Sequence, residues 1–133
     1  PDLSVWDGIG MALWLIGFGI EVVADAQKTT FNSKPENRDR WIDQGLWARS
    51  RHPNYLGEIL LWTGIALFGV SCFGGLEMIA WVSPIFIFIL LTRISGIPIL
   101  DERALAKWGD NPDYQHYREN TPALVLGLRA PKK

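Results

Sequence analysis

Three apolar stretches, each long enough to cross a lipid bilayer, alternate with polar and charged segments along the chain. They cover residues 5–23, 55–73 and 78–94, and few charged side chains interrupt them. About 20 apolar residues span the hydrocarbon core of a bilayer. The pattern therefore predicts an all-α, multi-pass integral membrane helical bundle with three transmembrane helices, at about residues 5–24, 55–73 and 78–94.

The polar segments predict a loop and two short helices. Residues 29–44 are polar and carry turn chemistry around residues 32–35, which predicts a loop. Ser95-Gly96-Ile97-Pro98 then breaks the third apolar pattern. Residues 101–108 and 113–118 have the composition of short helices, and the Gly and Pro residues around 109–112 separate them. We expect short cytoplasmic C-terminal helices here.

Basic residues are confined to two parts of the chain. All thirteen Lys and Arg lie in residues 28–51 or 93–133. Because cytoplasmic segments of membrane proteins are enriched in Lys and Arg, we expect both parts inside and the turn at 71–75 outside. The sequence starts without a Met or the basic region of a signal peptide. We therefore interpret residues 1–133 as one membrane domain belonging to a longer protein.

Composition excludes several classes of function. The net charge of −1 lacks the basic excess of nucleic-acid binders, so no nucleic-acid partner is expected. Cys72 is the only cysteine, which rules out an internal disulfide and a zinc cluster, and no metal site is predicted. Gly10 and Gly17 lie seven residues apart, so small residues are expected to mark a face packed on a neighbouring helix.

The segment 45–58 carries a dense polar cluster at the start of the second span. Its members are Arg49, Arg51, His52, Asn54, Tyr55 and Glu58. Such side chains are costly at a membrane helix unless they bind something, so they predict a site at the membrane surface. Pro53 suits a first helical turn, whose free N–H groups favour anions. Asn54 can bond a carboxamide or a ribose.

Arginines from several segments are expected to meet at this membrane face. They are Arg40, Arg49, Arg51, Arg93, Arg103 and Arg118. A guanidinium group binds phosphate in a two-pronged fashion, so several could hold a pyrophosphate and a further phosphate. The alternative is a patch that contacts lipid headgroups. We prefer that alternative for Arg38 and the tail, and ligand binding for Arg49 and Arg51.

Other polar residues leave two interpretations open. His52 can bind a ligand or cap the following helix. Glu58 shares a helical face with Trp62, and it can hold a ligand hydroxyl or pair with Arg49 or Arg51.

The remaining candidates are equally open. Glu21 and Asp25 form a polar face that either turns inward or is solvated. Asp101 and Glu102 can act at the site or complement a helix dipole. Tyr114 and Tyr117 can stack on a ring or anchor at the interface.

These motifs resemble a known enzyme family. Residues 50–58, preceded by Gly45-Leu46-Trp47, resemble the cytoplasmic motif of the steroid 5-alpha-reductase family. Residues 95–98 with Asp101-Glu102-Arg103 resemble its bacterial branch, and residues 107–117 resemble the C-terminal end of the related sterol reductases. The resemblance covers roughly residues 15–127, where Glu21, Asp25 and Lys28 fall at the family's polar cofactor contacts.

The resemblance implies an integral membrane enzyme that reduces the carbon–carbon double bond of a lipophilic enone, such as a 3-oxo-4-ene steroid. NADPH would supply hydride to the β-carbon, and a proton would follow at the α-carbon. The chain looks like the C-terminal cofactor half of such an enzyme, so N-terminal membrane segments of the same protein are expected to complete it. The residue that polarises the ketone lies in those segments, so the catalytic residue is unknown.

The candidate residues for binding the cofactor combine the polar cluster with the resemblance. They are Glu21, Asp25, Arg40, Arg49, Arg51, His52, Asn54, Tyr55, Glu58, Arg93, Glu102, Arg103, Tyr114 and Tyr117. The expected partners are NADPH, a lipophilic small-molecule substrate and membrane lipid, with the cofactor site on the cytoplasmic face.

Two other functions remain open. Isoprenylcysteine carboxyl methyltransferases and phospholipid methyltransferases of the same superfamily share Arg-His-Pro-x-Tyr and use S-adenosylmethionine. Residues 101–105 nearly satisfy their second signature, whereas Asn54, Gly57-Glu58 and residues 95–98 favour the reductase. The third possibility is a non-catalytic membrane subunit whose basic face binds lipid or a partner.

Overall fold

The computed structural model describes residues 5–68 and 82–127, and this part of the chain contains helices and no strands. The long helices are α1 (Val5–Asn32), α2 (Pro53–Phe68), α5 (Val82–Ile89), α6 (Gly96–Trp108) and α7 (Pro112–Asn120). Shorter pieces are the 3-10 turns η1 (Pro35–Asn37) and η2 (Gly45–Ala48) and the π-helical η4 (Leu90–Ile94). The predicted all-helical fold is confirmed for these residues.

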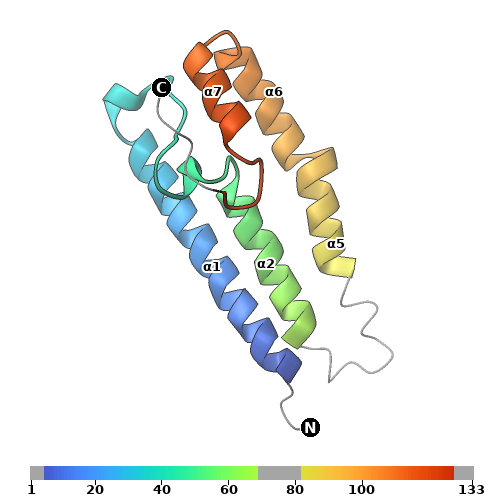
Figure 1. Ribbon diagram of the computed structural model, residues 1–133. Helices are drawn as coiled ribbons and strands as arrows, with labels where there is room; N and C mark the ends of the chain where they lie inside the picture. The colour runs from blue at the N-terminus through green and yellow to red at the C-terminus, as the bar shows by residue number, and fades with distance from the viewer. Residues whose placement is uncertain (1–4, 69–81, 128–133) are drawn as a thin grey trace.

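The helices lie roughly side by side along one direction (Figure 1). α1 and α2 run antiparallel, and α5 leads through η4 into α6, which continues toward the end where α1 finishes. α7 folds back beside α6 at that same end. The polar connections between α1 and α2 lie there too, so distant basic segments are gathered at one end of the bundle.

Two helices in the described part are long and apolar enough to cross a membrane, namely Val5–Asn32 and Val82–Trp108. Most of their apolar side chains face outward, among them Leu15, Ile16, Ile85 and Phe86. These features indicate a membrane protein. The end of the second predicted span, the turn at 71–75 with Cys72 and the start of the third span lie outside the described residues, so the three-span topology stays a prediction.

Two predicted helix boundaries were wrong. The loop expected at residues 29–44 starts only after Asn32, where α1 ends, because residues 25–32 contain no Gly or Pro to stop the helix. The break expected at residues 95–98 falls at Ser95, whose backbone is not helical, but the helix expected to begin near residue 101 already begins at Gly96. There the Ser95 backbone N–H donates to the Leu90 carbonyl at 2.8 Å, and Gly96 adopts a φ of +41°.

α1 and α2 pack through glycines. Gly10 and Gly17 on α1 are buried against Gly64 and Gly57 on α2. Without side chains the two backbones approach closely, which is how small residues hold membrane helices together. The predicted role of Gly10 and Gly17 as a packed face is confirmed.

The connection between α1 and α2 folds back on the C-terminal half of α1. Ala24, Phe31, Ile42 and Trp47 form a buried cluster. The Trp47 indole Nε1–H donates to the Ala24 carbonyl at 3.0 Å, which satisfies its polar atom inside the cluster. This packing fixes the residues that lead into the 50–58 motif.

The segment after α7 is bonded to the start of that motif. The Arg51 backbone N–H donates to the Pro122 carbonyl, and the Gly127 N–H donates to the Arg49 carbonyl, both at 2.8 Å. The Ser50 hydroxyl donates to the Leu124 carbonyl at 2.8 Å. These bonds hold the C-terminal helices against the α1–α2 unit.

Candidate functional site

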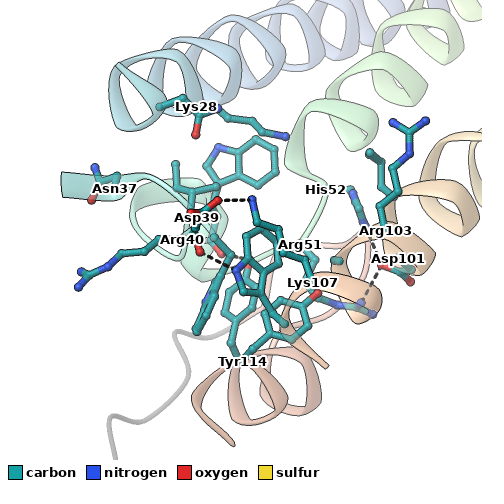
Figure 2. A pocket seen from close by; sticks show the side chains of 18 of the residues that line it. Lys28, Asn37, Asp39, Arg40, Arg51, His52, Asp101, Arg103, Lys107 and Tyr114 are labelled. Atoms are coloured by element: carbon teal, nitrogen blue, oxygen red, sulfur yellow. Dashed lines mark hydrogen bonds and ion pairs between the residues drawn. The ribbon is translucent and has the colours of Figure 1, made fainter. Parts of the chain in front are cut away.

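A pocket of about 460 Å³ lies where the polar end of α1, the start of α2, α6 and α7 meet (Figure 2). Its walls combine charged, amide and aromatic side chains from segments far apart in sequence. The charged and histidine members are Lys28, Arg38, Asp39, Arg40, Arg51, His52, Asp101, Arg103 and Lys107. The volume falls in the range of about 300–1,000 Å³ that is usual for small-molecule sites.

Positive charge dominates the pocket lining. Six Lys and Arg side chains face only two carboxylates, Asp39 and Asp101. Lys107 pairs with Asp39 at 3.1 Å, and Arg51 pairs with Asp101 at 3.2 Å. Four cations therefore have no carboxylate partner in the described part of the chain, namely Lys28, Arg38, Arg40 and Arg103. Such an excess attracts an anionic ligand.

Lys28 is the cation that α1 contributes to the pocket. Its ammonium group lies 5.0 Å from the centre of the Trp47 ring, a cation–π contact. Figure 2 shows the side chain reaching from α1 over an indole. Since α1 continues to Asn32, its last turns carry Lys28 and Asn32 to this end of the bundle.

An aromatic cluster forms another wall. Trp41 packs edge to face on Tyr114 and Trp108, with ring centres 5.1 Å and 5.7 Å apart. The Trp108 indole donates to the Asp39 carbonyl at 2.7 Å, which joins the end of α6 to the loop after η1. The Trp41 Nε1 atom is buried without a hydrogen-bond partner among the described residues. Buried donors are normally satisfied, so this unpaired atom is an exception within the pocket wall.

α7 is positioned by its own cap and by a buried hydroxyl. The Asn111 side chain accepts from the backbone N–H groups of Asp113 and Tyr114, and Pro112 occupies the first turn. The Tyr117 hydroxyl donates to the Trp47 carbonyl at 2.7 Å. Burial raises the pKa of both Tyr114 and Tyr117 above the ordinary value of 10.0, so both stay neutral at physiological pH.

The motif residues Arg51 and His52 meet Asp101 of α6. Asp101 Oδ1 lies 3.2 Å from Arg51 Nη1 and 3.4 Å from His52 Nε2. The Tyr55 ring stacks on His52, with centres 5.5 Å apart and planes 10° from parallel. Burial lowers the pKa of His52 below its ordinary 6.5, while the Asp101 carboxylate opposes that shift.

The structure brings half of the sequence-predicted residues to the pocket. Those that line it are Arg40, Arg51, His52, Asn54, Arg103, Tyr114 and Tyr117. The others do not line it. They are Glu21, Asp25, Arg49, Tyr55, Glu58, Arg93 and Glu102. Among these, Tyr55 touches the site through His52, and the four residues Asp25, Arg49, Arg93 and Glu102 are exposed.

Observed contacts bear on two open interpretations. Glu58 accepts from the Trp62 indole at 2.9 Å, so the shared helical face is real, and Arg51 pairs with Asp101 instead of Glu58. α6 begins at Gly96, so Asp101 lies past its first turn. The interpretation of Asp101 as a complement to the helix dipole at a first turn is therefore wrong.

Several pocket residues were missing from the list of cofactor-binding candidates. The main ones are Lys28, Asp39, Trp41, Trp47, Asp101, Lys107 and Trp108. Lys28, Asp101 and the 107–108 pair carried part of the family resemblance, which was the available signal. Trp41 and Asp39 carried none, because only tertiary packing brings them next to α6.

Over residues 5–68 and 82–127, these features define an all-helical structure with two candidate membrane helices and a cationic, aromatic-walled pocket at one end. The family described as “Protein of unknown function (DUF1295)” matches residues 1–121, so the chain belongs to the DUF1295 family.

Two curated relatives align with the chain. It is 29% identical over 144 positions to a Delta(14)-sterol reductase of Methylotuvimicrobium alcaliphilum, covering 94% of the chain and 31% of the reductase. It is 28% identical over 113 positions to the uncharacterized protein C594.04c of Schizosaccharomyces pombe, covering 69% of the chain and 33% of that protein. The chain thus spans about a third of each relative's length. No solved structure matches it significantly.

Proposed function

We propose that the chain forms the cofactor-binding part of an NADPH-dependent reductase that acts on the carbon–carbon double bond of a lipophilic enone, such as a 3-oxo-4-ene steroid. The observation that carries this proposal is the pocket in which unpaired cations and aromatic rings surround the 50–58 motif. The similarity to a protein named as a Delta(14)-sterol reductase supports the choice of reaction class.

The pocket residues fit the chemical parts of NADPH. Its pyrophosphate and 2′-phosphate need cations, and Lys28, Arg38, Arg40 and Arg103 have no carboxylate partner among the described residues. Its rings need flat apolar surfaces, which the cluster around Trp41 provides. The amide of Asn54, at the first turn of α2, can bond a carboxamide or ribose hydroxyl.

The same charge balance disfavours the methyltransferase alternative. S-adenosylmethionine carries a positive sulfonium group and an ammonium group, and only one carboxylate. Four unpaired cations would repel this ligand, whereas they attract the phosphates of NADPH. The pocket charge therefore supports the reductase where the sequence motifs left both chemistries open.

Bound NADPH would supply a hydride for the β-carbon of the enone, and a proton reaches the α-carbon in the same overall reaction. The residues of this chain then bind and orient the cofactor. Cations offset phosphate charge, and the aromatic wall excludes water from the rings. We assign the group that polarises the ketone to other membrane segments of the longer protein, in keeping with relatives about three times the length of this chain.

We also propose that the pocket faces the cytoplasm. The end of the bundle that holds it collects the basic residues 28–51 and the described part of 93–133, and Lys and Arg mark the cytoplasmic side. With it we propose a multi-pass arrangement, with the candidate substrate dissolved in the bilayer.

Thermal unfolding with added ligands tests the proposal. The purified protein in detergent is heated with NADPH, NADH or S-adenosylmethionine, and NADPH is expected to give the largest rise in unfolding temperature because only the bound state is stabilised. Protection by S-adenosylmethionine alone would replace the reductase with the methyltransferase. Protection by neither would leave the non-catalytic membrane subunit.

A further inference from the structure

Asp101 connects α6 to the two charged or titratable residues at the centre of the motif. One carboxylate oxygen, Oδ1, contacts both Arg51 Nη1 and His52 Nε2. The side chains of Arg51 and His52 are 13% and 9% exposed, so these contacts are shielded from water. A single residue, fifty positions from Arg51 in sequence, therefore orients both side chains.

Arg51 is largely occupied by the protein itself. Its Nη1 is bonded to Asp101, and its Nε donates to the Thr121 carbonyl at 3.2 Å. Each two-pronged edge of the guanidinium therefore has one member engaged, which leaves no free fork for a phosphate. Arg51 is therefore not available as the expected two-pronged phosphate ligand, and its role is to hold α6 and the segment after α7 to the motif. His52 is the residue of this group that faces the ligand.

His52 has one ring nitrogen engaged and one available. A carboxylate cannot donate, so the contact with Asp101 is a hydrogen bond when Nε2 carries the proton. Within the described residues, no hydrogen-bond partner occupies Nδ1, and His52 lines the pocket. Neutral His52 therefore presents Nδ1 as an acceptor, and protonated His52 presents it as a donor.

The charged groups around His52 set which form is present. Burial lowers its pKa, Asp101 opposes this, and Arg51 and Lys28 add to the lowering. The ring is therefore neutral at pH 7 when the pocket holds no anion. An anion beside Nδ1 favours the imidazolium form, because opposite charges stabilise each other and Nδ1–H becomes a donor.

We propose that Asp101 is a positioning residue that makes anion binding in this pocket proton-linked. It holds His52 by Nε2, so that an arriving anionic group is met by Nδ1–H and one proton is taken up. The inference rests on the proposed function only for the identity of the anion as a cofactor phosphate.

Calorimetric titration of the purified chain tests this inference. Sulfate is the first probe because, unlike a phosphate monoester, it does not titrate near neutral pH, and NADPH is the second. Each is measured between about pH 6 and about pH 8 in buffers of different ionisation enthalpy. The wild type is expected to take up as much as one proton per sulfate bound, and to bind up to about tenfold more tightly per unit fall in pH.

Variants separate positioning from a purely structural effect. Asp101→Asn is expected to lose most of the proton uptake, and His52→Gln all of it. Asp110→Asn changes an exposed carboxylate outside the pocket just after α6, and should retain the wild-type uptake. If Asp101→Asn fails to fold, His52→Gln still tests the proton uptake by His52 on which the inference depends, and unchanged uptake in that variant would overturn it.

Three results would overturn the inference: sulfate binding without proton uptake, unchanged uptake in Asp101→Asn, or no sulfate binding by the wild type. Proton-linked sulfate binding together with no NADPH binding has a different meaning. It would contradict the proposed reductase and leave the role of Asp101 standing.

Discussion

Gly17 and Gly57 meet backbone to backbone where α1 packs on α2. A Cβ atom placed on either glycine would lie 2.5 Å from the carbonyl oxygen of the other. Gly10 and Gly64 repeat this reciprocal contact farther along the same pair of helices, at 2.6 Å and 2.5 Å. Such proximity permits Cα–H···O contacts between helices. Because α1 and the start of α2 both carry pocket residues, the shape of the pocket depends on these glycines.

Substituting Gly57 is therefore expected to separate the two helices. Gly57→Ala places a methyl group against the Gly17 carbonyl and the Glu21 backbone N, which are not flexible groups. We expect a loss of about 1–3 kcal/mol in the free energy of unfolding, typical of overpacking. Denaturant unfolding in detergent measures it.

Gly19→Ala is the matched control for that experiment. A Cβ at Gly19 meets nothing within 4 Å, so this change should be neutral or stabilise the helix by up to about 1 kcal/mol. Equal destabilisation by both substitutions would show that α1 and α2 do not pack through Gly57.

The sequence predicted the helical class because apolar runs and glycine spacing are local signals. Helix ends were less well predicted, since hydropathy reports where a helix leaves lipid and not where it stops. α1 thus continues past the apolar run to Asn32. Gly96 and Pro98 predicted the interruption at Ser95, but the next helix begins directly at Gly96 and not near residue 101.

The sequence predicted the type of site, a cluster of cations and polar groups, but only some of the residues that line it. Charge and motif identified Arg51, His52 and Asn54, which lie at the start of one helix and so stay together. Whether Arg93 and Glu102 face the pocket depends on how their helices are rotated about the helix axis. Both side chains are exposed and do not face it. Asp101 was left open between a role at the site and a role at a helix dipole, because its partners lie some fifty positions away and their contact cannot be seen in the sequence.

Lys28 provides a sharp test of the pocket. Lys28→Met keeps the length of the side chain over Trp47 and removes the charge. If the cofactor phosphates lie among the pocket cations, NADPH affinity should fall by about 1.5–3 kcal/mol, the usual contribution of a hydrogen bond to a charged group. Equilibrium binding at low and high salt measures this, and the difference should shrink as salt screens the pocket.

Lys34→Met is the control for Lys28→Met. Lys34 is an exposed lysine six positions farther along, and it does not line this pocket. Its substitution should leave NADPH affinity within error of the wild type. Equal weakening by the two substitutions would indicate a diffuse surface effect and remove Lys28 from the site.

Tyr117 is expected to stabilise the fold through its hydroxyl group. Tyr117→Phe leaves the buried Trp47 carbonyl without its partner, which should cost about 1–3 kcal/mol. The raised pKa of Tyr117 adds a pH signature. Its neutral form is favoured in the folded state, so this stabilisation is present below the ordinary pKa of 10.0 and is lost as pH rises above it. Unfolding measured on both sides of that value should show a smaller alkaline loss in Tyr117→Phe than in the wild type.

His52 should give the opposite signature at acidic pH. Burial favours its neutral form, so its pKa in the folded protein lies below the ordinary 6.5. Between those two values the unfolded chain binds more protons than the folded one, and stability falls as pH drops below about 6.5. The slope from one group is at most about 1.4 kcal/mol per pH unit.

The difference in unfolding free energy between about pH 7 and about pH 5 should therefore be smaller in His52→Gln than in the wild type. In Asp101→Asn the fall in unfolding free energy at acidic pH should be at least as large as in the wild type, because this change removes the carboxylate that raises the pKa of His52. If the unfolding free energy fell by the same amount at acidic pH in His52→Gln and in the wild type, other groups would be responsible for that fall. His52 would then have no measurable desolvation penalty.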